Sequence, residues 1–180
     1  IVGPRSATPP EHDRPVDEPA PTPADARVQY YNVKFGIDMQ SPDGAQKQRG
    51  LFQAYLEGLQ WVMYYYFRGA DAASWGWYYR YYHAPMVWDL VSFDQFSRPV
   101  INFEIGQPFK PFQQLMAVLP AGSKSLLPPC YQWLFDSPES PILSFYPKNF
   151  EIDVDGVKVP WGGVSLISFI DPELLVSAMK

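Results

Sequence analysis

The sequence WVMYYYFRGADAASWGWYYRYYHAPMVW, residues 61–88, has twelve Trp, Tyr or Phe among its twenty-eight residues. Tyr and Trp combine a large apolar ring with a polar group that needs a hydrogen-bond partner when it is buried. Such a run is therefore either a dense packing centre or a surface on which planar ligands stack. The composition of the run is compatible with both interpretations.

A long helix is predicted to lead into this aromatic run. Across residues 45–68 the apolar side chains recur every three or four residues, and no proline interrupts them. Asp43 or Ser41 is the expected N-cap, and Gly69 stands where a left-handed C-terminal cap belongs. Because the apolar face is wide, we expect this helix to be largely buried, with the rings of residues 61–67 in the core.

The rest of the pattern indicates an α+β fold that is mostly helical and has a few short strands. Residues 28–40 alternate like a strand, but they fit a helix equally well. Asp155-Gly156 lies between two alternating segments of residues 150–161, which is a strong hairpin signal. The other expected elements are a loop at 70–74, helical turns within 86–96, a strand at 100–105, helices at 111–119 and 126–135, and a terminal helix from Pro172 to Met179.

The beginning of the chain has a composition of its own. Residues 1–27 contain seven prolines and eight charged residues but no aromatic residue. Such a segment cannot bury enough apolar surface to offset the entropy of ordering it. We therefore predict a disordered, Pro-rich linker over residues 1–27, with a Pro-rich docking motif as the alternative, and one domain over residues 28–180. The chain begins with Ile and has no signal-peptide pattern, so we expect a fragment of a longer protein.

Charge and cysteine content exclude several classes of protein. The net charge of −5 argues against a protein that holds nucleic acid through phosphate contacts alone. The single cysteine, Cys130, excludes a disulfide framework and a Cys-based zinc site and favours a reducing compartment. Its place on an apolar helix face predicts that it is a small core residue. No apolar run is long enough for a transmembrane helix, so no membrane partner is expected.

The titratable residues do not form a complete catalytic constellation. The carboxylates are scattered. A D-x-D pair such as Asp153–Asp155 can hold a divalent cation when further oxygen ligands converge, but here a tight turn alone explains it. His83 has no partner nearby in the sequence, and a histidine among aromatic residues is usually a hydrogen-bonded core residue. The sequence contains no Gly-rich phosphate loop and no hydrolase motif.

The second half of the aromatic run remains as the candidate site. Trp75 and Trp77 flank Gly76 just beyond the predicted helix end, where rings can face solvent. Stacking of a base on such a ring tolerates any base. Arg80, among tyrosines, offers a phosphate contact or a cation–π contact. The alternative is that all these rings pack against the helix.

Several motifs, in sequence order, resemble the second conserved region of the Xrn family of 5′→3′ exoribonucleases. They are YLEGLQWVMYYYFRG at 55–69, SWGWYY at 74–79, HAP at 83–85, FEIGQPFKPFQQLMAVLPAGSKSLLP at 103–128, SPILSFYPKNFEIDVDG at 140–156 and VSLISFIDPELLVSAM at 164–179. The resemblance covers residues 28–180. The PFKPFQQL and LLP segments are more similar to the cytoplasmic, Pacman-type branch than to the nuclear one.

The resemblance implies the C-terminal part of the Xrn nuclease core. In that family the magnesium-binding acids and the pocket for the 5′-monophosphate lie in a first conserved region, which this chain lacks. The resemblance thus implies that the chain is an RNA-contacting segment of a magnesium-dependent enzyme of mRNA decay and is inactive alone. Its implied partners are the first region and 5′-monophosphorylated RNA, and its implied location is the cytoplasm rather than the nucleus. The implied RNA-stacking residues are Trp75 and Trp77, with Tyr78, Arg80 and His83 around them.

The chain departs from the family pattern at the candidate site. SWGWYYRYYHAP has Arg80 at a usual proline, Tyr82 at a usual histidine and His83 at a usual tyrosine, and Ser168 replaces a usual proline. These changes, with the negative net charge, motivate an alternative function: a non-catalytic scaffold or protein-interaction module derived from the family.

Overall fold

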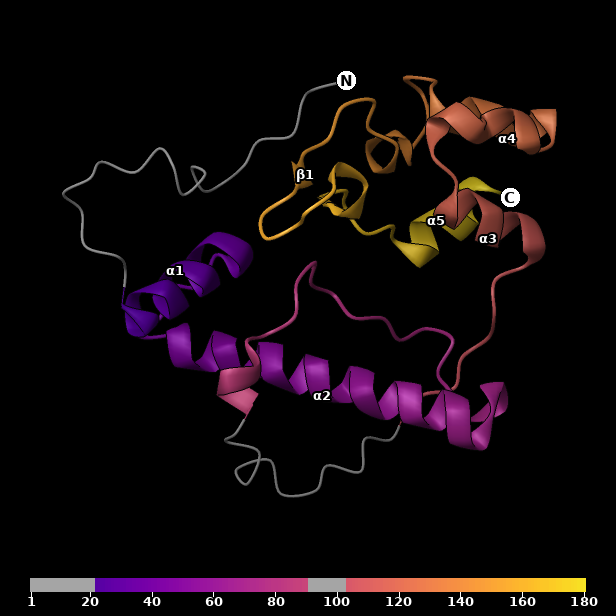
Figure 1. Ribbon diagram of the computed structural model, residues 1–180. Coiled ribbons are helices and arrows are strands. Elements are labelled where there is room, and N and C mark those ends of the chain that lie inside the picture. Colours follow the sequence, from indigo (N-terminus) through magenta and orange to yellow (C-terminus); the bar gives the residue numbers. More distant parts are fainter. Residues whose placement is uncertain (1–21, 91–102) are drawn as a thin grey trace. The chain divides into compact units, whose positions relative to one another are not determined.

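A computed structural model describes residues 22–90 and 103–180, and the chain divides into two compact units. We call the described part of residues 16–108 the N-terminal unit and residues 109–180 the C-terminal unit. The N-terminal unit contains helices α1 (Pro23–Phe35) and α2 (Gly44–Arg68) and the 3-10 turn η2 (Ala70–Ala72) (Figure 1). The C-terminal unit contains α3 (Pro111–Val118), η4 (Ala121–Leu126), α4 (Pro129–Gln132), η5 (Trp133–Phe135), η6 (Leu143–Phe145), β1 (Ile152–Asp153), η7 (Pro160–Gly162), β2 (Val164–Ser165) and α5 (Pro172–Ala178).

The mostly helical α+β class is confirmed, because the described chain holds several helices and one two-stranded sheet. None of the described helices has the length and apolarity that crossing a membrane requires.

Helix α1 begins inside the range that the composition assigned to the linker. Thr22 accepts a hydrogen bond from the Asp25 backbone N–H at 3.2 Å, and the Asp25 carboxylate accepts one in return from the Thr22 N–H at 3.1 Å. This capping box and Pro23 at the first helical position start the helix. The linker boundary at residue 27 is therefore wrong for residues 23–27, and the strand alternative for residues 28–35 is excluded. Residues 1–21 lie outside the described part.

Helix α2 confirms the predicted helix to within one residue. Asp43 occupies the N-cap position, but its side chain makes no capping hydrogen bond and instead pairs with Lys47 at 2.7 Å. Hydrogen bonds from Lys47 and Ser41 lower the pKa of the Asp43 carboxyl. Gly69 has the expected positive φ of 88°, but its ψ of 171° is not that of a left-handed cap, so this part of the prediction is wrong.

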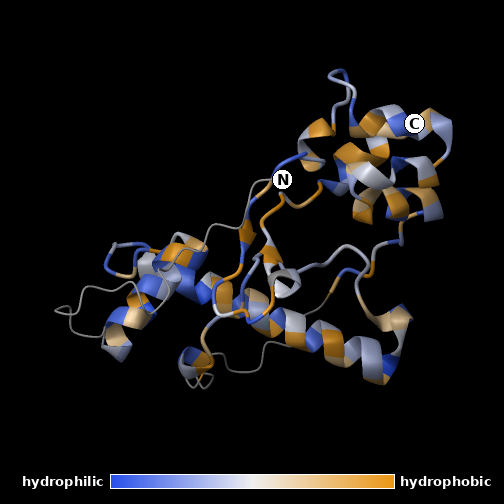
Figure 2. Ribbon diagram, turned by 45° about the horizontal axis from the view of Figure 1, so that its top comes forward, coloured by the Kyte–Doolittle hydropathy of each residue, from blue (hydrophilic) through white to orange (hydrophobic). Residues whose placement is uncertain are grey.

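The expectation that α2 is largely buried is also wrong. Leu51 and Phe52 are buried, whereas Tyr66 and Phe67 are 76% and 78% exposed. Large apolar or aromatic residues nevertheless continue along the helix as far as Phe67, and Figure 2 shows hydrophobic residues at intervals along α2. Residues 61–67 are therefore not core residues within the described chain, because the apolar period indicates a face to be covered and not what covers it.

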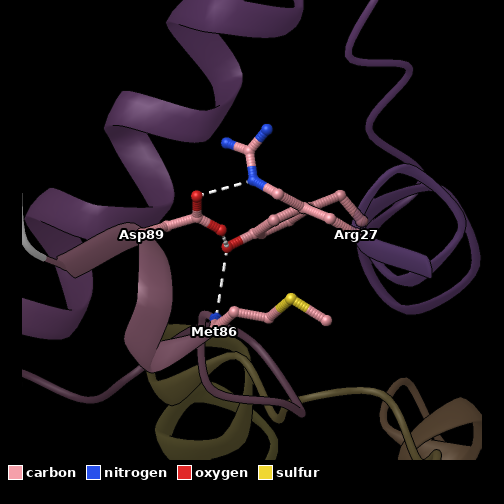
Figure 3. Close-up of polar contacts among 4 residues, drawn as sticks. Arg27, Met86 and Asp89 are labelled. Carbon is pink, nitrogen blue, oxygen red and sulfur yellow. Dashed lines mark hydrogen bonds and ion pairs between the residues drawn. The ribbon is translucent and has the colours of Figure 1, made fainter. Parts of the chain in front are cut away.

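The core of the N-terminal unit lies between α1, the start of α2 and residues 79–90. Its buried members are Tyr31, Ile37, Leu51 and Phe52, with Phe35, Tyr79, Tyr81 and Met86 packed against them. The Tyr31 hydroxyl donates to the Asp89 carboxylate at 2.7 Å and accepts from the Met86 N–H at 3.2 Å. Arg27 donates to the other oxygen of Asp89 at 2.6 Å (Figure 3). These bonds fasten residues 86–89 to α1.

The C-terminal unit has a core of its own. Helices α3 and α5 contact each other, and both begin with proline at the first turn as predicted. The helix predicted over 126–135 is observed as α4 followed by η5. The buried members of this core are Met116, Leu127, Leu134, Phe135, Ile142, Tyr146 and Leu175.

The predicted hairpin over residues 150–161 is wrong. Gly156 does form a turn, with φ of 72° and a 3.1 Å hydrogen bond from the Val157 N–H to the Val154 carbonyl. The strand that pairs with β1 comes later, since Ile152 lies opposite Ser165 and Asp153 opposite Val164 in the antiparallel sheet. The predicted strand at 100–105 is not observed at residues 103–105, and its first residues lie outside the described part.

Tyr146 gives the C-terminal unit a testable dependence on pH. Its hydroxyl donates to the Met116 carbonyl at 2.8 Å, and burial raises its pKa to about 12. An unfolded tyrosine loses its proton near pH 10. The contribution of Tyr146 to stability is thus complete below pH 10 and is lost as the pH rises towards 12.

We expect Tyr146→Phe to lower the free energy of unfolding by about 1 kcal/mol at pH 7, because one buried hydrogen bond is lost. This deficit should shrink between pH 10 and pH 12. Urea titrations of both proteins across this range provide the measurement. A deficit that stays constant would contradict the raised pKa.

Candidate functional site

The backbone of residues 74–77 is fastened between α2 and residues 103–106. Trp61, on α2, donates its indole N–H to the Ser74 carbonyl at 2.7 Å, and the buried Ser74 hydroxyl accepts from the Trp77 N–H at 3.2 Å. On the other side, the Trp75 N–H donates to the Ile105 carbonyl at 2.8 Å. These bonds hold the two candidate tryptophans on a fixed backbone.

Trp77 packs against α2. Its indole N–H donates to the Glu57 carboxylate at 3.2 Å. Its ring stacks with that of Trp61, with centroids 6.4 Å apart and planes inclined by 25°, and meets Phe103 edge-on at 5.9 Å. A Cβ on Gly58 would lie 3.0 Å from the end of the indole, so a larger residue there would require the ring to shift by a few tenths of an ångström. The packing interpretation of the aromatic run therefore describes Trp77 well.

Trp75 has a different environment. Its backbone is fixed by Ile105, yet the residue is 49% exposed. A half-open indole on a fixed backbone loses little conformational freedom when a planar group stacks on it. Of the two tryptophans, Trp75 therefore has the more open ring for a ligand.

The other three predicted site residues lie on the segment that follows. The Arg80 guanidinium lies 5.1 Å from the centroid of the Tyr78 ring, and Arg80 is exposed. His83 is half-buried and meets Phe35 of α1 edge-on at 6.3 Å, and its carbonyl accepts from the Tyr79 hydroxyl at 2.8 Å. His83 is thus packed towards α1, whereas Arg80 reaches solvent.

A groove of about 470 Å³ opens beside Trp77. It is lined by Glu57, Ser74, Gly76, Trp77, Phe103, Glu104 and Gly106. Neither Glu57 nor Glu104 is among the predicted site residues, because the two carboxylates are far apart in the sequence and form no local pair. The available signal for Glu57 was its position four residues before Trp61, which places both on one side of the helix.

The described residues offer no metal centre. They include no group of three or more His, Cys, Asp or Glu side chains placed to hold an ion. Asp153 accepts a hydrogen bond from the Asp155 N–H at 3.0 Å, which the turn at Gly156 explains. Cys130 is exposed, so its assignment to the core is wrong. In residues 22–90 and 103–180 the donor set does not fit magnesium.

Comparison with known proteins agrees with the helical architecture. The family described as the Xrn1 helical domain matches residues 25–180. The chain is 44% identical over 151 residues to human 5′-3′ exoribonuclease 1 and 45% identical over 151 residues to 5′-3′ exoribonuclease 2 of Aspergillus oryzae. It is 43% identical over 150 residues to 5′-3′ exoribonuclease 1 of Schizosaccharomyces pombe. The identities to exoribonuclease 1 and to exoribonuclease 2 are nearly equal, so they do not favour either branch of the family.

These matches cover 84% of this chain in the human and Aspergillus comparisons and 83% in the third. They span only 8%, 14% and 11% of the respective relatives. The fold and the matches define the chain as a helical domain of the kind found in 5′-3′ exoribonucleases. The chain belongs to the Xrn family.

Proposed function

We propose that this chain is the RNA-contacting segment of a magnesium-dependent 5′→3′ exoribonuclease. Its substrate is RNA with a 5′-monophosphate. Its role is mRNA decay in the cytoplasm, which rests on the similarity of the PFKPFQQL and LLP segments to the cytoplasmic branch, since overall identity favours neither branch. The observation that carries the proposal is the half-exposed ring of Trp75 on a backbone held by Ile105. Tyr78, Arg80 and His83 follow Trp75 in the sequence, and the exposed Arg80 supplies a cation for a phosphate. Trp77, packed against α2, supports the segment that carries Trp75.

The catalytic acids and the magnesium ion belong to a first conserved region, in cis or as a separate chain. The described part of this chain has no carboxylate cluster that fits the ion. When bound, magnesium polarises phosphate oxygens and activates water. The proposed task of this chain is to hold the 5′ nucleotides in place.

An apolar stripe on α2 supports the partnership with a first region. Leu59, Val62, Met63 and Tyr66 recur at helical spacing and are exposed. By helix geometry they lie on the side of α2 away from Glu57 and Trp61, which contact the segment of Trp77. An exposed stripe of this kind marks an interaction surface.

The proposal is tested by supplying the first region. We expect magnesium-dependent, processive decay of 5′-monophosphorylated RNA by the chain joined to or mixed with the first conserved region, and much slower decay of 5′-hydroxyl RNA. The isolated chain should give no products under the same conditions. Decay by the pure isolated chain, or by the first region equally well without this chain, would contradict the proposal.

The second candidate is a scaffold or protein-interaction module without catalysis. The apolar stripe on α2 and the net charge of −5 favour it. If the chain is a scaffold, it should bind the first region, but the resulting assembly should neither degrade RNA nor bind it. The same decay assay, accompanied by an RNA-binding titration, separates the two functions.

A further inference from the structure

The groove beside Trp77 combines acidic and aromatic groups. Glu57 and Glu104 both line it, together with the rings of Trp77 and Phe103. Ser74, Gly76 and Gly106 complete the lining, and the two glycines have no side chains that would narrow it. Among the residues that the structure describes, no lysine, arginine or histidine lines the groove.

The Glu57 carboxylate is oriented but keeps its negative charge uncompensated. It accepts from the Trp77 indole N–H at 3.2 Å and from the Gln53 side-chain amide at 3.0 Å. Both donors are neutral. Within residues 22–90 and 103–180, neither Glu57 nor Glu104 forms an ion pair with a basic side chain. The groove therefore presents two negative charges beside two aromatic rings.

This chemistry selects the charge of the ligand. A phosphate would meet two carboxylates and, among the described lining residues, no cation, so the groove disfavours an RNA backbone. A guanidinium group fits both features, because it binds carboxylates through two parallel hydrogen bonds and stacks on aromatic rings. Cation–π attraction is strongest over tryptophan.

We propose that the groove is a socket for an arginine side chain of a partner polypeptide, distinct from the RNA-facing surface at Trp75. The proposal goes beyond the proposed function, since it assigns the groove beside Trp77 to a ligand other than RNA. It requires a basic partner segment and does not require that the partner be a nuclease.

The test is an NMR titration of the chain with a blocked Gly-Arg-Gly peptide. The reporters are the Trp77 indole N–H, identified by its loss in Trp77→Phe, and the backbone N–H groups of Gly76 and Gly106. We expect saturable shifts of these signals with the arginine peptide and none with the matched citrulline peptide, which has the same shape and no charge. Adenosine 5′-monophosphate should leave the Trp77 indole N–H unmoved, whereas Gly76 and Gly106 adjoin the Trp75 segment and are not used in this comparison.

Glu104→Gln is the decisive variant because Glu104 is exposed and forms no hydrogen bond or ion pair with the described residues. We expect it to weaken peptide binding by about fivefold, the effect of losing one partly exposed ion pair. Glu57→Gln should act in the same direction, and Glu139→Gln, an exposed glutamate in the C-terminal unit, should change nothing.

Equal shifts with arginine and citrulline peptides, or equal affinity in Glu104→Gln, would overturn the proposal. So would a saturable shift of the Trp77 indole N–H by adenosine 5′-monophosphate alone, which would assign the groove to RNA. Each of these results leaves the decay assay of the proposed function unaffected, so the two failures are distinguishable.

Discussion

Replacement of Trp75 by alanine should slow the decay of 5′-monophosphorylated RNA by about tenfold or more, because stacking of one base contributes roughly 1–3 kcal/mol. The effect is expected in the nuclease assembled with its first region. The Trp75 ring is half exposed, and the Ile105 hydrogen bond that fixes the segment comes from the backbone. The variant should therefore fold normally and lose affinity for RNA. Single-turnover decay rates and RNA-binding titrations provide the measurement.

The matched control is Trp161→Ala, which removes a tryptophan that is 87% exposed in the C-terminal unit. It should leave both the decay rate and the RNA affinity unchanged. Trp75→Phe, which keeps a smaller ring, should retain part of the activity. Unchanged decay and binding in Trp75→Ala would show that the ring is not a stacking surface.

Trp77→Ala is not an equivalent test of stacking. That substitution would remove the ring contacts with Trp61 and Phe103 and the hydrogen bond to Glu57. Any loss of activity would then include a loss of the scaffold that holds Trp75. The two tryptophans, which stand two residues apart in one motif, thus call for different experiments.

The sequence predicts α2 well because local information is sufficient for it. A helical period sustained over more than twenty residues, without proline, fixes the element and nearly its bounds. The helical period does not determine whether the apolar face of α2 is buried. Covering the apolar face requires another surface, and no local pattern in the residues of α2 identifies that surface.

The errors elsewhere have similar physical causes. In α1 the alternation of Tyr31, Val33 and Phe35 resembles a strand, whereas the deciding signal is the capping box of Thr22 and Asp25 nine residues earlier. At Gly156 the turn was predictable, but the partner strand lies beyond a further turn at η7. Turn chemistry determines where the chain bends, and pairing depends on contacts that are not local.

At the candidate site, too, some features follow from the local sequence and others depend on the tertiary fold. The aromatic motif locates Trp75, Trp77 and Arg80 on one segment, and this can be read from the residues. The different exposure of the two tryptophans depends on hydrogen bonds to Ser74 and Ile105, which come from the tertiary fold. Glu104 joins Glu57 at the groove although 47 positions separate them in the numbering, so no motif links the two.

The site also depends on how residues 79–89 are fastened to α1, and Asp89 is the centre of that attachment. Its side chain is 8% exposed and accepts from both Arg27 and the buried Tyr31 hydroxyl. We expect Asp89→Ala to lower the free energy of unfolding of the N-terminal unit by about 2–3 kcal/mol, because hydrogen bonds to a charged group are lost and the Tyr31 hydroxyl is left without its acceptor. The estimate stays below that for a fully buried pair, since the Arg27 side chain is 35% exposed.

Urea unfolding followed by tryptophan fluorescence measures this loss. Asp71→Ala, which removes an exposed carboxylate in η2, is the control and should have little effect. Tyr31→Phe should cost less than Asp89→Ala, because the Asp89 carboxylate keeps its hydrogen bond from Arg27 and only the Met86 N–H loses its acceptor. If Asp89→Ala is no more destabilising than Asp71→Ala, the network is peripheral to the fold. If it is destabilising as expected, it should also weaken RNA binding, since Tyr79 and His83 pack on the same core and the segment of Arg80 lies between them.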